Sequence, residues 1–145
     1  MPDKSFEQSI DFYQVATPTG PVWLPLVEVD LVRANGSKVR LPLLFDTGAS
    51  TMTLRHDLYP LLGLTAWDSG TPVDTLTAGD TAPVVVYRYD ATFEFLGKTI
   101  NCPVQLARLP SNPLYVGLFG RDQMFNHFGF GFWETPHLLF ATVSP

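Results

Sequence analysis

The sequence predicts an all-β protein, folded as a partly closed barrel with one or two short helices. Three observations support this fold class. Short apolar runs alternate with turn residues along the chain, thirteen prolines and 13% aromatic residues accompany only 16% charged residues, and no repeat or linker interrupts the series. At 145 residues the chain is long enough for one domain with a real core and too short for two ordinary domains.

The first part of the chain divides into an arm and the start of the domain. Residues 1–21 have irregularly spaced apolar residues that do not decide between helix and strand, so we assign them to an N-terminal arm and the domain to 22–145. Residues 22–32 are rich in β-branched and apolar residues and predict a strand. Asn35-Gly36 predicts a type I′ turn, and the return strand over 39–45 leads directly into Asp46.

The middle of the chain predicts a short helix followed by a hairpin. Leucines at helical spacing over 54–64 predict a helix, which Pro60 and Gly63 limit to about two turns. Residues 72–90 predict two strands around a tight turn at Gly79-Asp80, because glycine in the first central position suits a type II′ turn. The tip of this hairpin is small and polar.

The last third predicts two more hairpins around a strand and a helix. Residues 91–96 and 99–106 are expected to pair about Gly97-Lys98, followed by an irregular loop over 109–113. Further elements are expected in chain order: a strand at 115–119, a short helix at 121–127, and a hairpin of 128–134 with 138–143. The aromatic residues of this region have no basic residues among them, so we assign them to the core rather than to base stacking: Phe125, Phe128, Phe130, Phe132 and Trp133.

The candidate for chemistry is Asp46. An apolar run delivers this carboxylate to a strand end, and Thr47, Gly48 and Ala49 follow where the chain must turn. Asp is rarely found between buried flanks unless it is paired or hydrogen-bonded. Such a carboxylate is positioned by the fold and is a candidate catalytic group.

The stretch Phe45-Asp46-Thr47-Gly48-Ala49-Ser50 resembles the active-site signature of aspartic proteases. The chain length resembles that of the single-lobed retropepsin-like members, including bacterial ones. A second element, Leu118-Phe119-Gly120 followed by Arg121-Asp122, resembles the other landmark of that family before its short helix. The resemblance covers roughly residues 22–143.

This resemblance implies a two-fold homodimer that hydrolyses polypeptides. Asp46 would pair with Asp46 of a second copy, since the chain has one Asp-Thr-Gly and is too short for a second lobe. Thr47 would interlock with its symmetry mate, Gly48 would contact the substrate backbone, and Ala49 would support the site. The hairpin tip would form a flap over the substrate, through Thr77, Ala78, Gly79 and Asp80. The local sequence alone is equally compatible with a plain surface hairpin.

One position departs from the retroviral pattern. Retroviral members often carry an acidic residue where Ser50 stands, paired with the arginine at the Arg121 position, so the partner of Arg121 stays open. Asp122 is assigned a structural role.

Composition excludes several other classes of function. A net charge of −5 gives no basic footprint for nucleic acid, and no apolar run approaches a membrane span or a signal peptide. His56, His127 and His137 are too scattered for a zinc site, so neither metal nor cofactor is expected. One cysteine, Cys102, is compatible with a reducing compartment, and we expect a cytoplasmic protein.

Two other functions stay open at this point. The first is a non-catalytic dimeric β-barrel that binds peptides or keeps the Asp-Thr-Gly corner for structural reasons. The second is a monomeric barrel of the lipocalin type that binds a small molecule and gives Asp46 no role. Neither the substrate nor its cleavage site can be derived from the sequence.

Overall fold

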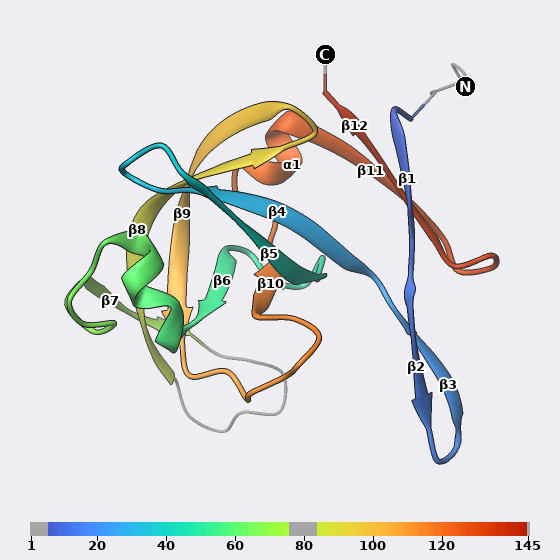
Figure 1. The fold of residues 1–145 in the computed structure, drawn as a ribbon, viewed down its shortest axis with the longest axis horizontal. Coiled ribbons are helices and arrows are strands. Elements are labelled where there is room, and N and C mark those ends of the chain that lie inside the picture. Colours follow the sequence, from blue (N-terminus) through green and yellow to red (C-terminus); the bar gives the residue numbers. More distant parts are fainter. Residues whose placement is uncertain (1–5, 76–83, 145) are drawn as a thin grey trace.

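The structure, a computed structural model, describes residues 6–75 and 84–144. In this part of the chain most residues lie in strands (Figure 1). The first strands are β1 (Gln8–Asp11), β2 (Tyr13–Thr17), β3 (Gly20–Leu24), β4 (Leu26–Val32), β5 (Lys38–Phe45) and β6 (Met52–Arg55). They are followed by the 3-10 helix η1 (His56–Leu62), β7 (Thr71–Thr75), β8 (Val84–Phe95) and β9 (Lys98–Ala107). The chain closes with β10 (Gly117–Phe119), α1 (Met124–His127), β11 (Phe128–Trp133) and β12 (Leu138–Val143).

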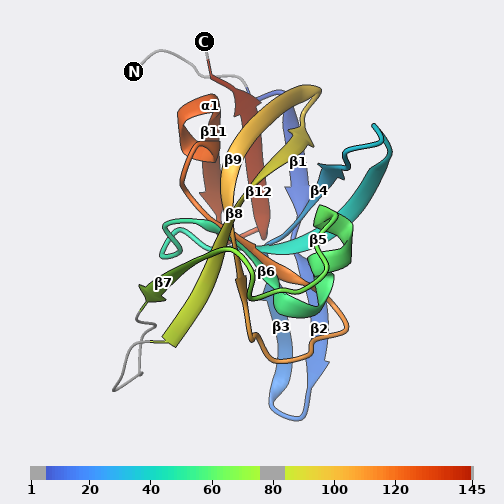
Figure 2. The same ribbon diagram turned by 90° about the vertical axis from the view of Figure 1, so that its left-hand side faces the viewer.

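The main sheet has seven strands in the order β4-β5-β10-β6-β9-β8-β7. β5 and β10 run parallel, with Leu44 opposite Leu118 and Phe45 opposite Phe119. β4 also pairs with β8, which brings the first strand of the order back against the sixth (Figures 1 and 2). This arrangement places the end of β5 in the middle of the molecule, beside β10.

Two smaller sheets lie beside the main one. β12 lies between β1 and β11, with Gln8 opposite Ala141, so the two ends of the described chain lie side by side. β2 and β3 form a separate hairpin that projects beyond the rest of the described chain (Figures 1 and 2). β3 runs across the boundary at 21/22 that the sequence suggested between arm and domain; that division stays a prediction.

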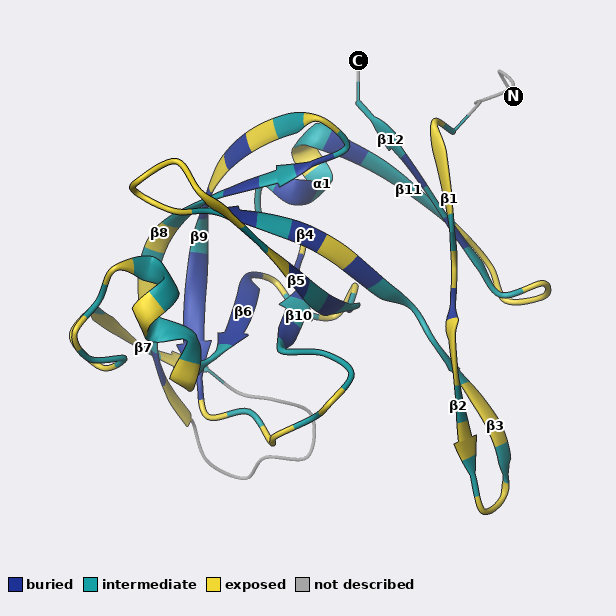
Figure 3. Cartoon of the chain, viewed as in Figure 1, coloured by how far each residue is buried: buried dark blue, intermediate teal, exposed yellow. Residues whose placement is uncertain are grey.

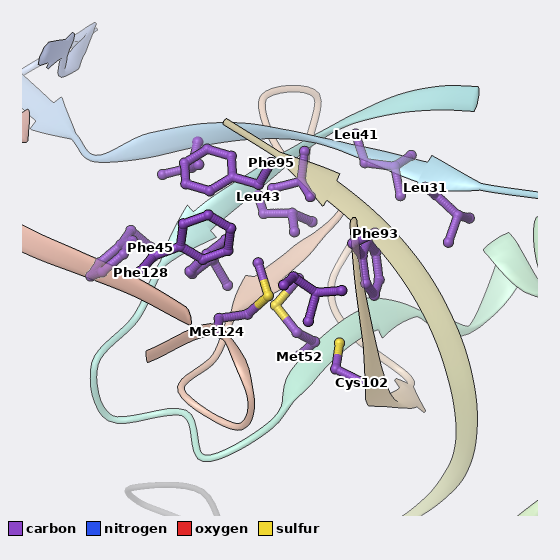
Figure 4. Packing of buried hydrophobic residues seen from close by; sticks show 14 of the residues in the cluster. Leu31, Leu41, Leu43, Phe45, Met52, Phe93, Phe95, Cys102, Met124 and Phe128 are labelled. Carbon is purple, nitrogen blue, oxygen red and sulfur yellow. The ribbon is translucent and has the colours of Figure 1, made fainter. Parts of the chain in front are cut away.

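The core is built from the alternating residues of these strands. In β4 and β5 every second side chain is buried, because successive side chains of a strand point to opposite faces (Figure 3). Met52 and Met124 pack in this interior against leucines and phenylalanines of the surrounding strands (Figure 4). Burial also raises the pKa of the Cys102 thiol to about 12, so this cysteine behaves as a small apolar side chain.

Two turns differ from the sequence prediction. At Asn35-Gly36 only Gly36 has a positive φ, 83°, so the turn is not type I′. The Asn35 side chain instead accepts the Ser37 N–H (2.9 Å between N and O), and the Gly36 N–H donates to the Arg33 carbonyl oxygen (2.9 Å), which gives a longer turn with Gly36 as its left-handed residue. The turn predicted at Gly97-Lys98 lies one residue earlier, at Leu96 (φ 49°) and Gly97 (φ 76°), because Lys98 pairs with Phe95.

Several strand limits also differ. The strand predicted over 22–32 breaks at Pro25, which has no N–H to donate. Residues 84–95 form one continuous strand rather than parts of two hairpins, because β9 pairs along most of its length. The helix predicted over 54–64 is the 3-10 helix η1, and the helix predicted over 121–127 is limited to the four residues of α1. The strand predicted over 115–119 is limited to the three residues of β10. No helix in the described ranges is long and apolar enough to cross a membrane.

The aromatic residues near the C-terminus divide into two groups. Phe128 is buried, and Phe125 and Phe130 pack against the core as expected. Phe132 and Trp133 are instead 43% and 63% exposed, so their assignment to the core was wrong. They are the last two residues of β11, next to the β11–β12 turn, and Phe132 still contacts the Phe45 ring.

Candidate active site

The chain turns sharply at Asp46, directly after β5. The Asp46 N–H donates to the carbonyl oxygen of Phe119 on β10 (3.2 Å), which continues the pairing of β5 with β10 past the strand end. The Asp46 carbonyl oxygen then accepts the Ala49 N–H (3.2 Å), which closes a tight turn. Inside this turn the Gly48 N–H donates to Asp46 Oδ1 at 2.9 Å. Backbone and side chain of Asp46 are therefore both held by the corner, which we define as residues 46–50.

The second sequence landmark lies against this corner. The Arg121 N–H donates to the Ala49 carbonyl oxygen (3.0 Å), and the Asp122 N–H donates to that of Ser50 (2.8 Å). Residues 118–122 and residues 46–50, far apart in the sequence, therefore hold each other by backbone hydrogen bonds. Such bonds do not depend on side-chain identity, so the sequence alone could not predict this contact from local pattern.

Two glycines allow the segments to approach so closely. A Cβ at Gly120 would lie 2.3 Å from the carbonyl carbon and oxygen of Thr51, and a Cβ at Gly117 would lie 2.1 Å from the carbonyl oxygen of Thr53. Both distances are far shorter than van der Waals contact. Gly120 is part of the sequence landmark Leu118-Phe119-Gly120, and its close contact with Thr51 explains why a glycine stands there. Gly117 was missed, because a glycine in a strand shows only that a backbone approaches, not which one.

An aromatic cluster fixes the position of the strand end below the corner. Phe45 stacks on Phe119 of β10 (ring centroids 5.3 Å apart) and meets Phe130 of β11 edge-on at 4.8 Å. It also contacts Phe125 of α1 and Phe132 of β11. The residue immediately before Asp46 is thus clamped by three elements, and rotation of the strand end would disturb all of these contacts.

Comparisons with known proteins agree with this geometry. A family model described as aspartyl protease matches residues 27–122, about two thirds of the chain. The chain belongs to the aspartyl protease family. The matched range includes both the Asp46 corner and residues 118–122.

Solved structures include proteins similar in fold to this aspartyl protease family member. A retropepsin-like aspartic protease from Rickettsia conorii is similar over 99% of this chain and 98% of its own, with 19% identity and a TM-score of 0.59. The EIAV protease complexed with the inhibitor HBY-793 matches over 68% of this chain and 82% of its own, with 24% identity and a TM-score of 0.46. No curated protein shows a significant match.

In this member of the aspartyl protease family the Asp46 corner is open on one side. Asp46 and Ala49 are half-buried, whereas Thr47 and Gly48 are exposed. Within residues 6–75 and 84–144 the carboxylate accepts a hydrogen bond only from Gly48. These ranges also contain no cluster of three metal-ligating side chains. The corner therefore presents one aspartate to solvent, held in place by its own backbone.

A second sequence of the Asp-Thr/Ser-Gly type, Asp68-Ser69-Gly70, bears on whether one chain could supply both carboxylates. It does not build a second corner. Asp68 is exposed in a turn, and Gly70 is held at β8, where its N–H donates to the Tyr89 hydroxyl (2.7 Å). β6 and β9 separate β8 from β10 in the main sheet, and no apolar strand leads into Asp68. The aspartate that could complete the pair is not Asp68.

Two further expectations concern the flap and Arg121. Residues 77–80, the predicted flap tip, lie outside the described residues; the flanking strands β7 and β8 are paired as expected, with Thr75 opposite Val84.

Arg121 is exposed and makes no ion pair with any described residue. Its backbone, through the bond to Ala49, is what connects it to the corner.

Proposed function

We propose that this chain is an aspartic endopeptidase that hydrolyses extended polypeptides as a two-fold homodimer. The observation that carries the proposal is the Asp46 corner: a carboxylate at a strand end, held by the Gly48 N–H and by β10, with its exposed side open. Membership of the aspartyl protease family supports the same activity.

The chemistry requires a second carboxylate. Hydrolysis by water without a metal needs one group to accept a proton from water and another to donate one to the substrate carbonyl oxygen. Two carboxylates that share one proton perform both tasks, and one carboxylate does not. Because Asp68 lies elsewhere, the proposed partner is Asp46 of a second copy, related by a two-fold axis.

The proposed substrate lies in the cleft that the two copies create. An extended peptide would be held by main-chain hydrogen bonds, with pockets for alternate side chains. The exposed Gly48 suits a close approach of the substrate backbone, and residues 77–80 are the proposed closing segment. We propose that the enzyme works in the cytoplasm, where Cys102 would stay reduced.

The direct test is Asp46→Asn. The amide has the size of the carboxylate but cannot act as a base, so cleavage of a denatured protein substrate should fall by about 10²-fold or more, while circular dichroism and Tm stay unchanged. Asp90→Asn is the matched control, since Asp90 is an exposed aspartate of β8 outside the corner, and it should keep full activity. Normal turnover by folded Asp46→Asn protein would refute the assignment.

A second candidate function is a dimeric module that binds peptides without cutting them. The observation that favours it is the exposed Arg121, which lacks an ionic partner in the described part of the chain, so that its link to the corner is the backbone hydrogen bond to Ala49 and not an ion pair. The same wild-type sample distinguishes the two functions. Binding of unstructured peptides with no cleavage across pH 3–8 would establish the binding module.

A further inference from the structure

The β2–β3 hairpin is a separate two-stranded sheet and lacks the neighbouring strands that support the two larger sheets. β2 and β3 pair only with each other among the described strands, and none of their residues is buried. From Phe12 to Val27 the sequence contains no charged residue. Isolated two-stranded hairpins are marginally stable in water, and natural edge strands are usually protected by charges. An uncharged, exposed hairpin is therefore a surface that a partner would cover.

The base of this hairpin is fixed to the body of the molecule. Trp23 stacks on His137 in the β11–β12 turn, with ring centroids 4.2 Å apart and planes 9° from parallel. The Phe12 N–H donates to the His137 carbonyl oxygen at 3.0 Å. On the other side the Phe45 N–H donates to the Pro25 carbonyl oxygen at 2.9 Å. The hairpin therefore begins one hydrogen bond away from the residue that precedes Asp46.

One face of the hairpin is apolar and uncovered. Residues opposite each other in an antiparallel pair share a face, so Tyr13 with Leu24 and Val15 with Val22 form one stripe. We call these four residues the hairpin face. Tyr13 is 51% and Val22 44% exposed. The opposite face carries Trp23, which is occupied by its contact with His137.

More exposed apolar surface lies at the end of β11, beside Phe45. Phe132 touches the ring of Phe45 (4.9 Å between centroids) and yet is 43% exposed, and its neighbour Trp133 is 63% exposed. Of the six large apolar residues that are exposed in the described chain, four lie on these two hairpins: Tyr13, Val22, Phe132 and Trp133. The Trp23–His137 stack joins the two hairpins.

We propose that the hairpin face, together with Phe132 and Trp133, is the surface that holds a second copy of this chain. The inference rests on the proposed function, in which two copies bring their Asp46 side chains together. Each hairpin starts beside Phe45 and its five-residue strands reach about 17 Å outward. A copy whose Asp46 meets this Asp46 therefore comes within reach of the hairpin.

The size of a stable interface supports the same partner. Stable protein interfaces use about 20–30 residues on each side, and the five residues of the corner are far too few. The central part of such interfaces is depleted of charge and enriched in aromatic residues. The uncharged segment 12–27 and the exposed aromatic residues of β11 have this composition, and Pro25 and Phe132 both contact Phe45, the residue before the corner.

The test places one negative charge on each face of the same hairpin. Val22→Glu puts it on the hairpin face, and Ala16→Glu puts it on the opposite, exposed face. Both variants are made in the Asp46→Asn background, so that self-cleavage does not interfere, and dimer dissociation is measured by analytical ultracentrifugation. Val22→Glu should raise the dimer Kd about tenfold or more, and Ala16→Glu should leave it nearly unchanged. Trp133→Glu provides a second, independent variant on β11 with the same expected direction.

The outcomes separate this inference from the proposed function. If the unmodified protein dimerises and Val22→Glu and Trp133→Glu dimerise equally well, the surface assignment is overturned while the shared active site stands. An unchanged dimer with weaker peptide binding by Val22→Glu would assign the hairpin face to the substrate and also overturn the inference. If the protein is monomeric at millimolar concentration, the inference fails, and the shared-site mechanism fails with it. Weaker dimers from both Val22→Glu and Trp133→Glu, with Ala16→Glu unaffected, would establish it.

Discussion

At the scale of single residues, Gly48 and Asp46 act as one unit. The Gly48 N–H donates to Asp46 Oδ1, and a Cβ at position 48 would lie 3.2 Å from the same oxygen. That distance is tighter than ordinary contact, so a side chain at position 48 would displace the carboxylate by a few tenths of an ångström. Because Gly48 has no Cβ, the Asp46 carboxylate can keep the position in which it accepts the Gly48 N–H.

Gly48→Ala should therefore reduce kcat about tenfold or more with little change in Tm, because small displacements of a reacting group carry large rate penalties. Steady-state kinetics and thermal unfolding of the purified variant measure both effects. Gly129→Ala is the matched control, since its Cβ would make only an ordinary contact with Thr142 Cγ2 at 3.4 Å. An active Gly48→Ala enzyme would show that the carboxylate tolerates this displacement.

At the scale of elements, the Tyr89 side chain of β8 makes two hydrogen bonds to the backbone of the loop before β7. The Tyr89 hydroxyl donates to the Trp67 carbonyl oxygen (2.7 Å) and accepts the Gly70 N–H (2.7 Å). A Cβ at Gly70 would lie 2.6 Å from the Tyr89 ring, so the loop packs on this ring without a gap. Tyr89 therefore determines where β7 begins, and with it the base of the hairpin that carries residues 77–80.

Tyr89→Phe should lower the free energy of unfolding by about 1–3 kcal/mol, because it leaves a carbonyl oxygen and an N–H of the loop without their partner. Urea denaturation measures the difference. Tyr59→Phe serves as the control, since the Tyr59 hydroxyl has no hydrogen-bond partner among the described residues. Equal losses in the two variants would mean that the hydroxyl bonds of Tyr89 add nothing specific.

How far the sequence predicts these elements depends on whether the deciding interaction is local. The strand leading into Asp46 and the last hairpin follow from alternation of apolar residues, and the turn at residues 96–98 was placed within one residue by its glycine. The type of the turn at Asn35 was missed, because the Asn35 side chain competes for the Ser37 N–H. The pattern of the first twenty residues predicts neither helix nor strand, since β1 is stabilised by β12, more than 120 residues away.

The candidate site shows the same limit. The motif at residues 45–50 and the landmark at residues 118–122 could both be found in the sequence, but not the backbone bonds that join them. The aromatic clamp on Phe45 was assigned only to a general core. Phe132 and Trp133 were placed there too, because composition identifies an apolar side chain and does not say whether its own chain covers it.

At the scale of the whole molecule, the proposed active site belongs to two chains. Each copy contributes one Asp46, so an Asp46→Asn chain that pairs with a wild-type chain should inactivate the dimer. If equal amounts exchange freely, about a quarter of all dimers carry two intact aspartates, and activity should fall to about half of that of the wild-type chains alone.

This mixing experiment is measured as specific activity per wild-type chain after verified exchange of a labelled copy. Dilution below the dimer Kd should lower the same quantity by mass action. A mixture with Val22→Glu, Asp46→Asn chains is the informative control, since chains that dimerise poorly should inhibit less. Undiminished activity after exchange would exclude a shared site.

The pairing of β1 with β12 also makes this chain nearly circular. Phe6 lies against Phe140 (5.6 Å between ring centroids), and the Thr142 hydroxyl donates to Glu7 Oε1 at 3.2 Å, so the two ends of the described chain lie on adjacent strands (Figure 1). A short peptide could join them, and new ends could be opened at Pro18-Thr19 between β2 and β3. Such a circular permutant would keep every strand pair of the fold, and it would allow the hairpin to be shortened from its tip one residue at a time.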